Sequence, residues 1–313
     1  MSSRTDHFDG RRFFNPNGAN GQPFWRVPQL LLTRRTRWPS SVAVERRKPS
    51  KPEANEVVLT FIGHATFLIQ AAGANVLIDP VYALRASPLS VAGPRRVRAP
   101  GVEFDELPAI STVLLSHNHY DHCDLGTLQL LERRFHPQFI TPLGNGRLLR
   151  SAGIQQVEEL DWWEAGTNEP LTVTVTPAQH FSARGPFDRN RALWGGFLVQ
   201  AAGRRILFAG DSGYGPHFRE IGARLGPINL ALIPIGAYEP RWFMKDIHMN
   251  PAEAVQAHQD LASMQSIAMH FGTFQLTMEG IDEPVRELVR ALLERGVPAD
   301  QFRVLAVGDS VVV

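Results

Sequence analysis

The chain has 313 residues, a formal net charge of +1, 43% hydrophobic residues and a single cysteine, Cys123. This length allows one large domain or two small ones, and the single cysteine excludes an intramolecular disulfide framework. No apolar run approaches the roughly 20 residues that span a bilayer, and the N-terminus lacks the apolar core of a secretory signal. We therefore expect a cytoplasmic protein.

The charge is unevenly distributed along the chain. Residues 1–50 hold ten Lys and Arg against three Asp and Glu, so this segment carries +7 and the remainder −6. It also contains apolar residues such as Trp25, Leu30 and Trp38. Two interpretations stay open: an arm that packs on the domain, which we prefer, or a peripheral contact with the inner face of an anionic membrane. The acidic remainder argues against a nucleic-acid partner.

Periodicity and turn residues predict the elements in chain order. Residues 1–55 lack sustained periodicity and predict an irregular basic arm, followed by one domain over residues 56–313. The predicted strands cover residues 57–70, 75–78, 111–115, 139–141, 171–176, 193–200, 205–209, 230–235, 266–269, 302–307 and 310–313. Helices are predicted over 125–135, after an Asn250-Pro251 cap, and over 283–295, where Gly296 ends the helix. This alternation predicts a layered α/β sandwich of mixed sheets and permits a pseudo-duplicated layout.

Four potential metal ligands stand close together directly after the predicted strand 111–115. They are His117, His119, Asp121 and His122. Zinc prefers imidazole and carboxylate ligands, and a catalytic zinc leaves one position for water. His117 and His119 are two apart, so an extended backbone projects both to one side. One tetrahedral ion that keeps a water cannot use all four, so two ions are expected.

Three further candidate ligands, His180, Asp211 and His270, each stand just beyond a predicted strand. A solvated polar loop would explain the first cluster alone, but it does not explain this repeated placement. Ligands gathered at strand ends from distant parts of a chain are typical of sites in α/β folds. The sequence therefore predicts a metal site.

These residues make the chain resemble the metallo-β-lactamase superfamily. Within it, the chain resembles N-acyl-phosphatidylethanolamine-hydrolysing phospholipase D and its bacterial relatives. The resemblance runs from about Phe61 to Leu276 and rests on the stretches FIGHATFLI, IDPVYALRASP, LSHNHYDHCD, YEPRWFMKDIHMNPAEAV and AMHFGTFQL. It implies a four-layer αβ/βα sandwich with two mixed β-sheets, formed by a hydrolase domain over residues 56–313.

The resemblance also implies roles for individual residues. One zinc would be held by His117, His119 and His180, the second by Asp121, His122 and His270, and Asp211 would bridge them. A hydroxide shared by the two zinc ions would attack the phosphorus of a phospholipid diester, with Asp121 among the catalytic residues. The alternative is a zinc-dependent lactonase or amidase that acts on a small soluble substrate. The physiological substrate, the leaving-group acid and the oligomeric state, a homodimer included, stay open.

Several other residues have two interpretations. His64 is either a catalytic group near the metals or a hydrogen-bonded core histidine. For His248 we prefer a catalytic role, in which it contacts substrate phosphate or the reacting water. Residues 238–243 either line a lipid pocket or simply pack. Asp79 either bonds a metal-bound histidine or forms a turn, and Cys123 is expected to be a buried spectator thiol.

Overall fold

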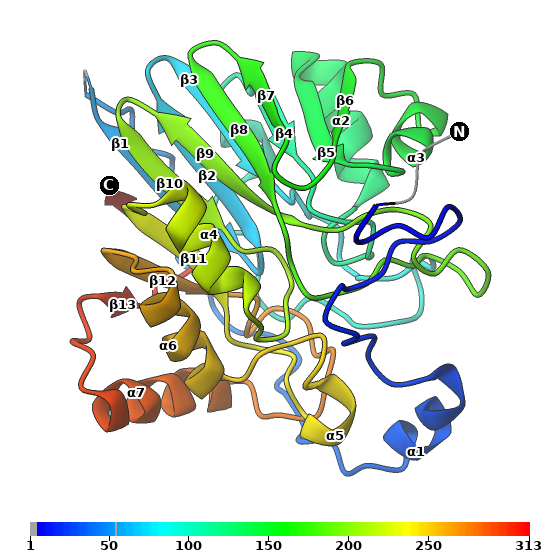
Figure 1. Ribbon diagram of the computed structural model, residues 1–313. Coiled ribbons are helices and arrows are strands. Elements are labelled where there is room, and N and C mark those ends of the chain that lie inside the picture. Colours follow the sequence, from blue (N-terminus) through cyan, green and yellow to red (C-terminus); the bar gives the residue numbers. More distant parts are fainter. Residues whose placement is uncertain (1–4, 54) are drawn as a thin grey trace.

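The computed structural model describes residues 5–53 and 55–313 of the chain. Its body consists of two mixed sheets of seven strands each, flanked by helices (Figure 1). This is the layered α/β sandwich with two mixed sheets that the sequence predicts. None of the helices among the described residues is long and apolar enough to cross a membrane.

The first sheet takes most of its strands from the N-terminal half and one from the C-terminus. Its order is β14-β1-β2-β3-β4-β5-β6, and its strands are β1 (Val57–Gly63), β2 (Thr66–Ala71), β3 (Ala74–Ile78), β4 (Thr112–Leu114), β5 (Gln138–Pro142), β6 (Val157–Leu160) and β14 (Ser310–Val312). Neighbours are antiparallel from β14 to β3 and parallel from β3 to β6.

The second sheet repeats this pattern. Its order is β13-β12-β11-β10-β9-β8-β7, and its strands are β7 (Ala165–Asn168), β8 (Leu171–Thr176), β9 (Gly196–Ala201), β10 (Arg204–Phe208), β11 (Leu230–Pro234), β12 (Gln265–Met269) and β13 (Phe302–Arg303). Neighbours are antiparallel from β7 to β10 and parallel from β10 to β13. Strands β14 and β1–β6 thus correspond in order and direction to β7–β13, which is the pseudo-duplicated layout that the sequence permits.

The helices lie outside the sheets or in the arm. They are η1 (Phe24–Arg26), α1 (Val27–Leu31), η2 (Phe104–Glu106), α2 (Leu125–Phe135), α3 (Gly146–Ser151), α4 (His217–Leu225), α5 (Arg241–Met244), α6 (Pro251–Asp260) and α7 (Glu283–Arg295). The predicted start of α6 is present as a capping box: Glu253 N–H donates to Asn250 Oδ1 at 2.8 Å and Asn250 N–H donates to Glu253 Oε2 at 3.0 Å. Gly296 ends α7 at φ 63°.

The hydrophobic core lies where the two sheets face each other. Every residue of β1, β2 and β11 is buried. The rings of Phe61 and Phe67 pack 4.9 Å apart, and Trp194 is among the largest fully buried side chains. Because helices and the opposite sheet cover both faces, these strands are largely apolar on both faces rather than alternating.

Three predictions about the elements are wrong. Residues 57–70 are two strands, because the chain turns at His64 with φ 58°; the turn is buried, and its polar residues, His64 and Thr66, are not typical turn residues. Residues 304–307 leave the sheet after β13. Within the first 50 residues, which predict only loop, η1 and α1 form, with Pro28 in the first turn of α1.

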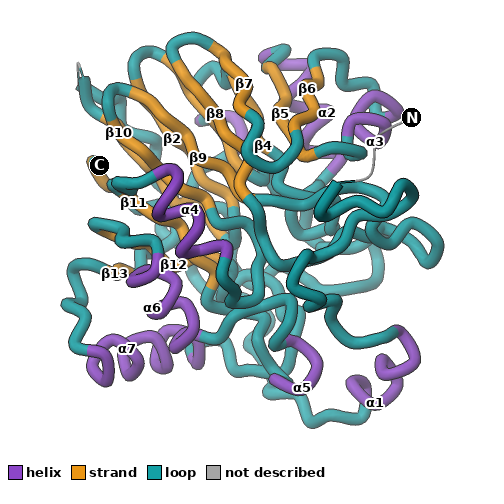
Figure 2. The backbone as a smooth tube through the Cα atoms, viewed as in Figure 1, coloured by secondary structure: helices purple, strands orange, loops and turns teal. Residues whose placement is uncertain are grey.

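The N-terminal arm packs against the body over much of its length. It is mostly loop (Figure 2), but Phe13 belongs to the main core cluster. His7 stacks on Trp162 with ring centroids 4.4 Å apart, and its Nε2 lies 2.7 Å from Asp161 Oδ1. The structure therefore shows tertiary contacts well before residue 56, where the predicted domain begins.

Candidate metal centre

The chemically active side chains gather between the sheets, at the ends of strands. His64 follows β1, Asp79 follows β3, and the segment 117–122 follows β4. From the second half, His180, Asp211 and His270 follow β8, β10 and β12. The structure thus brings together all seven residues that the sequence nominates as ligands: six lie in two adjoining groups, and Asp211 lies between these groups and forms a further one with His180 and His248.

The first group contains three imidazoles, His117, His119 and His180. His119 Nδ1 lies 2.9 Å from His117 Nε2 and 3.2 Å from His180 Nε2, so the three nitrogens point at one another. Burial and the neighbouring histidines hold the pKa of His117 well below its ordinary value and lower that of His119 to about 3. Burial likewise lowers the pKa of His180 to about 4. All three rings are therefore neutral at neutral pH, which is the form that binds metal.

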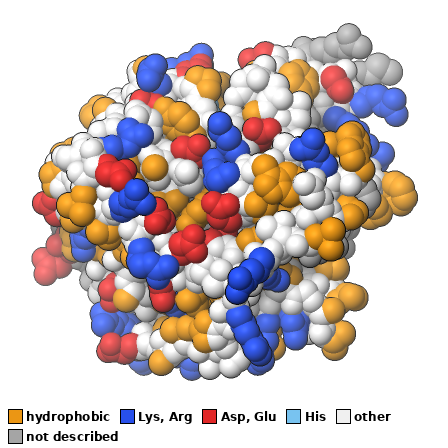
Figure 3. All heavy atoms as spheres, turned by 90° about the horizontal axis from the view of Figure 1, so that it is seen from below, with side chains coloured by type: hydrophobic (Ala, Val, Ile, Leu, Met, Phe, Trp, Pro, Cys, Tyr) orange, Lys and Arg blue, Asp and Glu red, His pale blue; other side chains and the backbone are white. Residues whose placement is uncertain are grey.

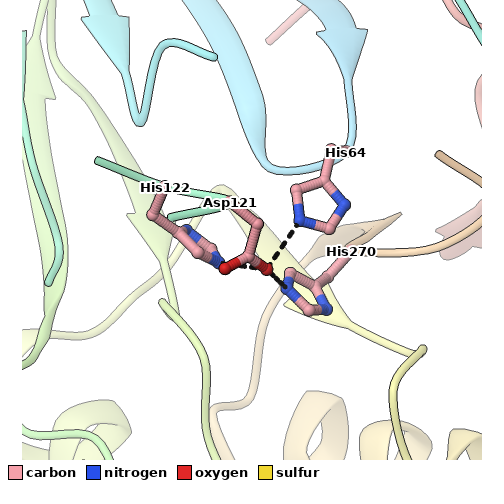
Figure 4. A group of neighbouring side chains, drawn as sticks. All are labelled: His64, Asp121, His122 and His270. Atoms are coloured by element: carbon pink, nitrogen blue, oxygen red, sulfur yellow. Dashed lines mark hydrogen bonds and ion pairs between the residues drawn. The ribbon is translucent and has the colours of Figure 1, made fainter. Parts of the chain in front are cut away.

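The second group contains His64, Asp121, His122 and His270 (Figure 4). Asp121 Oδ2 lies 3.1 Å from His64 Nε2, 3.2 Å from His270 Nε2 and 3.6 Å from His122 Nε2. His64 therefore lies beside the carboxylate of Asp121 and is a potential metal ligand. The ligand set that the family resemblance implies does not include His64. Its backbone carbonyl also accepts a hydrogen bond of 2.8 Å from the His270 N–H, which ties β1 to the end of β12.

Asp211 lies between the two groups. Its Oδ2 is 3.1 Å from His122 Nε2 and 3.2 Å from His270 Nε2 on one side, and 3.9 Å from His117 Nε2 and 3.8 Å from His180 Nε2 on the other. Its Oδ1 is buried and has no hydrogen-bond partner within residues 5–53 and 55–313. A carboxylate in this position can face both groups at once.

The electrostatics of this cluster suit divalent cations. Burial opposes the charges of Asp121 and Asp211, yet the surrounding imidazoles hold the pKa of both carboxyls well below its ordinary value. Burial also opposes the charges of two of these imidazoles, but the carboxylates hold the pKa of His122 well above its ordinary value and raise that of His270 to about 9. Without metal, protons on these two rings balance the carboxylates; bound cations would take their place.

A buried carboxylate orients the second group from outside. Asp79 is fully buried, and its Oδ1 accepts from the Ser116 N–H at 2.7 Å. Its Oδ2 lies 2.7 Å from His122 Nδ1 and accepts from Ser116 Oγ at 2.5 Å. Nε2 of His122 is thereby directed toward Asp211. Of the two interpretations of Asp79 that the sequence leaves open, the structure supports the histidine contact. Cys123 is buried next to this segment, as expected.

His248 is buried beside the cluster, with Nε2 4.0 Å from Asp211 Oδ2 and its ring 5.0 Å from that of His180. Burial holds the pKa of His248 well below its ordinary value, so the ring is neutral. Arg241 fixes the backbone here: it donates to the His248 carbonyl at 2.8 Å and to Glu253 Oε2 at 2.7 Å.

An apolar cavity of about 860 Å³ adjoins the first group. Its lining includes Leu30 from the arm, Phe181, Phe243 from α5, and Tyr120. The ring of Phe181 packs 4.5 Å from that of His119 and 5.0 Å from that of His180, so the cavity and the metal site share a wall. Of residues 238–243, Phe243 lines this cavity, whereas Tyr238 is buried elsewhere.

The sequence gives no indication of two residues at this site. Arg184 stacks over Tyr120 at 3.9 Å and donates to the carbonyls of Asn118 and Cys123, both at 2.9 Å, so it braces the ligand segment from outside. Asn15 contacts His180 from the arm. Neither residue stands in a recognisable spacing with the ligands, so the sequence holds no signal for them.

Comparisons with known proteins identify the family of the chain. A family model described as Beta-lactamase superfamily domain matches residues 74–271. An uncharacterized protein of Mycobacterium tuberculosis is 42% identical over 244 residues, which cover 76% of this chain and 65% of that protein. The N-acyl-phosphatidylethanolamine-hydrolyzing phospholipase D 1 of Caenorhabditis elegans is 40% identical over 248 residues, 75% of this chain and 69% of that protein. The matched region thus spans about two thirds of the length of these relatives.

Solved structures show the same fold at lower identity. An isothiocyanate hydrolase from Delia radicum gut bacteria gives a TM-score of 0.65 at 22% identity, covering 81% of this chain and 98% of the other. Igni18, a metallo hydrolase from Ignicoccus hospitalis, gives 0.62 at 22% identity, covering 82% and 98%. Since the matched family model spans most of the two-sheet body and the same fold recurs in these hydrolases, the chain belongs to the metallo-β-lactamase superfamily of metal-dependent hydrolases.

Proposed function

We propose that the protein is a binuclear zinc phosphodiesterase of the phospholipase D type, acting on N-acyl-phosphatidylethanolamine-like lipids. The apolar cavity that shares Phe181 with the metal site carries the proposal, because a small soluble substrate does not need it. The relatives from Caenorhabditis elegans and Saccharomyces cerevisiae, at 40% and 35% identity, carry names that state hydrolysis of this lipid class.

The candidate ligands divide into one set for each of two ions. One ion would be held by His117, His119 and His180, the other by Asp121, His122 and His270, and Asp211 would contact both. A bound pair of divalent ions supplies Lewis acidity and lowers the pKa of a water. His64 would either hold Asp121 in place through a hydrogen bond or act as a further metal ligand. The neutral ring of His248, whose buried Nδ1 has no hydrogen-bond partner among the described residues, would orient a phosphoryl oxygen.

Hydrolysis of this kind forms a bond between phosphorus and the oxygen of water and breaks the bond from phosphorus to the N-acylethanolamine oxygen. The released alcohol takes one proton, and phosphatidic acid keeps the water oxygen. The reactive end of the lipid would approach past His119 and Asp121, because these are the ligands that keep some exposure, and the acyl chains would occupy the cavity.

We further propose that the protein contacts membranes peripherally through the face that carries α1 and α5. These helices lie at the bottom of Figure 1, and Figure 3 views the molecule from that side, where basic and hydrophobic side chains are interspersed with acidic ones. Trp25 and Leu32 flank α1 and are 77% and 88% exposed, and Phe187, next to the cavity lining, is 81% exposed. Exposed Arg34 and Arg37 would face anionic head groups.

The decisive experiment incubates the zinc-loaded protein with N-acyl-phosphatidylethanolamine in water enriched in oxygen-18, alongside a panel of lactones. We expect N-acylethanolamine without label and phosphatidic acid with one labelled oxygen, both detected by mass spectrometry. Asp211→Ala should lose the metal pair and all turnover. A protein that holds two zinc ions but opens only lactones would refute the lipid assignment.

Variants separate the cavity from the chemistry. Phe243→Ser should slow turnover of the lipid while leaving turnover of a soluble phosphodiester such as bis(p-nitrophenyl) phosphate unchanged, because Phe243 lines the cavity and is not among the donors. For the membrane face, Trp25→Ser with Leu32→Ser should reduce co-sedimentation with anionic vesicles. Val312→Ser is the matched control, because Val312 is 61% exposed on β14. Equal binding of both variants would contradict the proposed face.

A further inference from the structure

One side chain of the N-terminal arm holds the backbone of a metal-ligand candidate from both sides. Asn15 is 3% exposed, and its Nδ2 donates to the His180 carbonyl at 2.9 Å. The His180 N–H in turn donates to Asn15 Oδ1 at 3.2 Å. The amide therefore pairs with His180 as a neighbouring strand would, although 165 residues separate the two in sequence.

The arm holds this amide in place. The Gly18 N–H donates to the Asn15 carbonyl at 2.9 Å and closes a turn, and Asn15 Nδ2 also bonds the Ala19 carbonyl. On the preceding side, the Phe13 N–H donates to the Asn190 carbonyl at 2.8 Å, and the Phe13 ring is in the core. Asn17 bonds the side chain of Gln179, the residue before His180.

Apart from the two bonds to Asn15, His180 is held mainly by a hydrogen bond from its ring. Its Nδ1 donates to the Ile247 carbonyl at 2.9 Å, which fixes the ring so that Nε2 faces His119. His180 follows β8 and precedes a loop, so no strand neighbour holds its peptide groups. The backbone pair with Asn15 takes the place of that neighbour.

We propose that Asn15 is a positioning residue that completes the metal site, so that the N-terminal arm is part of the centre rather than an appendage. The inference rests on the proposed metal site but not on the identity of the substrate. Losing Asn15 leaves the N–H and carbonyl of His180 unpaired in a buried place and releases the ligand from its fixed position.

The test measures metal binding directly. Wild-type protein and Asn15→Ala are stripped of metal and titrated with Zn²⁺ against a competing chelating dye, and Co²⁺ absorption reports coordination geometry. We expect Asn15→Ala to weaken binding of one of the two ions by about 10–100-fold, the range seen when groups that orient ligands are lost, and to change the Co²⁺ spectrum. Asn15→Asp, which keeps the acceptor for the His180 N–H but not the donor, should lie between the two.

Asn20→Ala is the matched control, since Asn20 is an exposed asparagine of the same arm whose side chain, within the part of the chain that the structure describes, donates only to the Gly18 carbonyl. It should bind Zn²⁺ like the wild type. The proposal fails if Asn15→Ala and Asn15→Asp bind both ions with wild-type affinity and spectrum, whether or not their melting temperatures fall. Should Asn15→Ala not fold, Asn15→Asp decides alone. A wild-type protein that binds no metal would instead overturn the proposed function.

Discussion

Replacing Asp79 by asparagine separates the orientation of a ligand from the stability of the fold. The amide can keep its carbonyl toward the Ser116 N–H, which now donates to Oδ1 at 2.7 Å. Its NH₂ group then faces His122 Nδ1, at present 2.7 Å from Oδ2, and requires a lone pair there. The ring proton of His122 would move to Nε2, the atom that faces Asp211 and the proposed ion. A protonated Nε2 cannot bind metal.

The expected magnitude follows from this change of tautomer. Loss of a group that orients a ligand typically weakens metal binding by about 10–100-fold, or roughly 1.4–2.7 kcal/mol. Because metal binding adds to the free energy of unfolding, Asp79→Asn should lower the free energy of unfolding of the zinc-loaded protein by about that amount. The decrease should be smaller for the protein from which EDTA has removed the metal. Asp79 adopts φ 40°, which asparagine tolerates better than most residues, so little backbone strain is added. Asp79→Ala should cost about 3–5 kcal/mol even without metal, because it leaves buried partners unpaired.

Urea denaturation with and without EDTA, together with metal content by mass spectrometry, measures both effects. Asp124→Asn is the control, because Asp124 accepts from the backbone N–H groups of Tyr82 and Ala83 and contacts no ligand. Full zinc occupancy at wild-type affinity in Asp79→Asn would show that the tautomer argument is wrong.

Three further predictions concern stability. Removing metal with EDTA should lower the melting temperature, and adding Zn²⁺ should restore it, because the cations balance buried carboxylates; an unchanged melting temperature would argue against bound metal. Glu253→Ala should cost about 1–2 kcal/mol in urea denaturation, because it removes both the capping box of α6 and the ion pair with Arg241. Burial lowers the pKa of His217 to about 3, so its contribution to stability is complete above pH 6.5 and is lost as the pH falls toward 3, by about 1.4 kcal/mol at pH 5.5. His217→Gln should lessen this acid dependence relative to wild type, with exposed His136→Gln as the control.

The sequence predicts which candidate ligands come together better than it predicts their surroundings. The spacing of His117, His119, Asp121 and His122 after a strand is a local pattern, and His180, Asp211 and His270 could be added because each also follows a predicted strand, although their strands lie in the other sheet. Asn15 and Arg184 bond to backbone groups far away in sequence. A contact of that kind produces no recognisable spacing of residue types in the sequence.

The same limit applies to the elements. The turn at His64 is buried, and its apolar neighbours continue the pattern of β1 into β2, so hydrophobicity alone cannot divide the two strands. Short exposed strands such as β7, Ala165–Asn168, are held in place by pairing with β8 rather than by their own composition, and the sequence did not predict them. Tertiary pairing decides both cases.

The duplicated strand order has a consequence for how the two halves of the molecule are joined. His117 and His119 come from the first half and His180 from the second; Asp121 and His122 come from the first half and His270 from the second. Each ion bound to these groups would cross-link the two sheets, because its ligands would come from both of them. The separation of the two sheets at this site would then depend on the coordination of the ions as well as on packing of the apolar core. Binding of the ions and packing of the two sheets against each other would therefore be thermodynamically coupled.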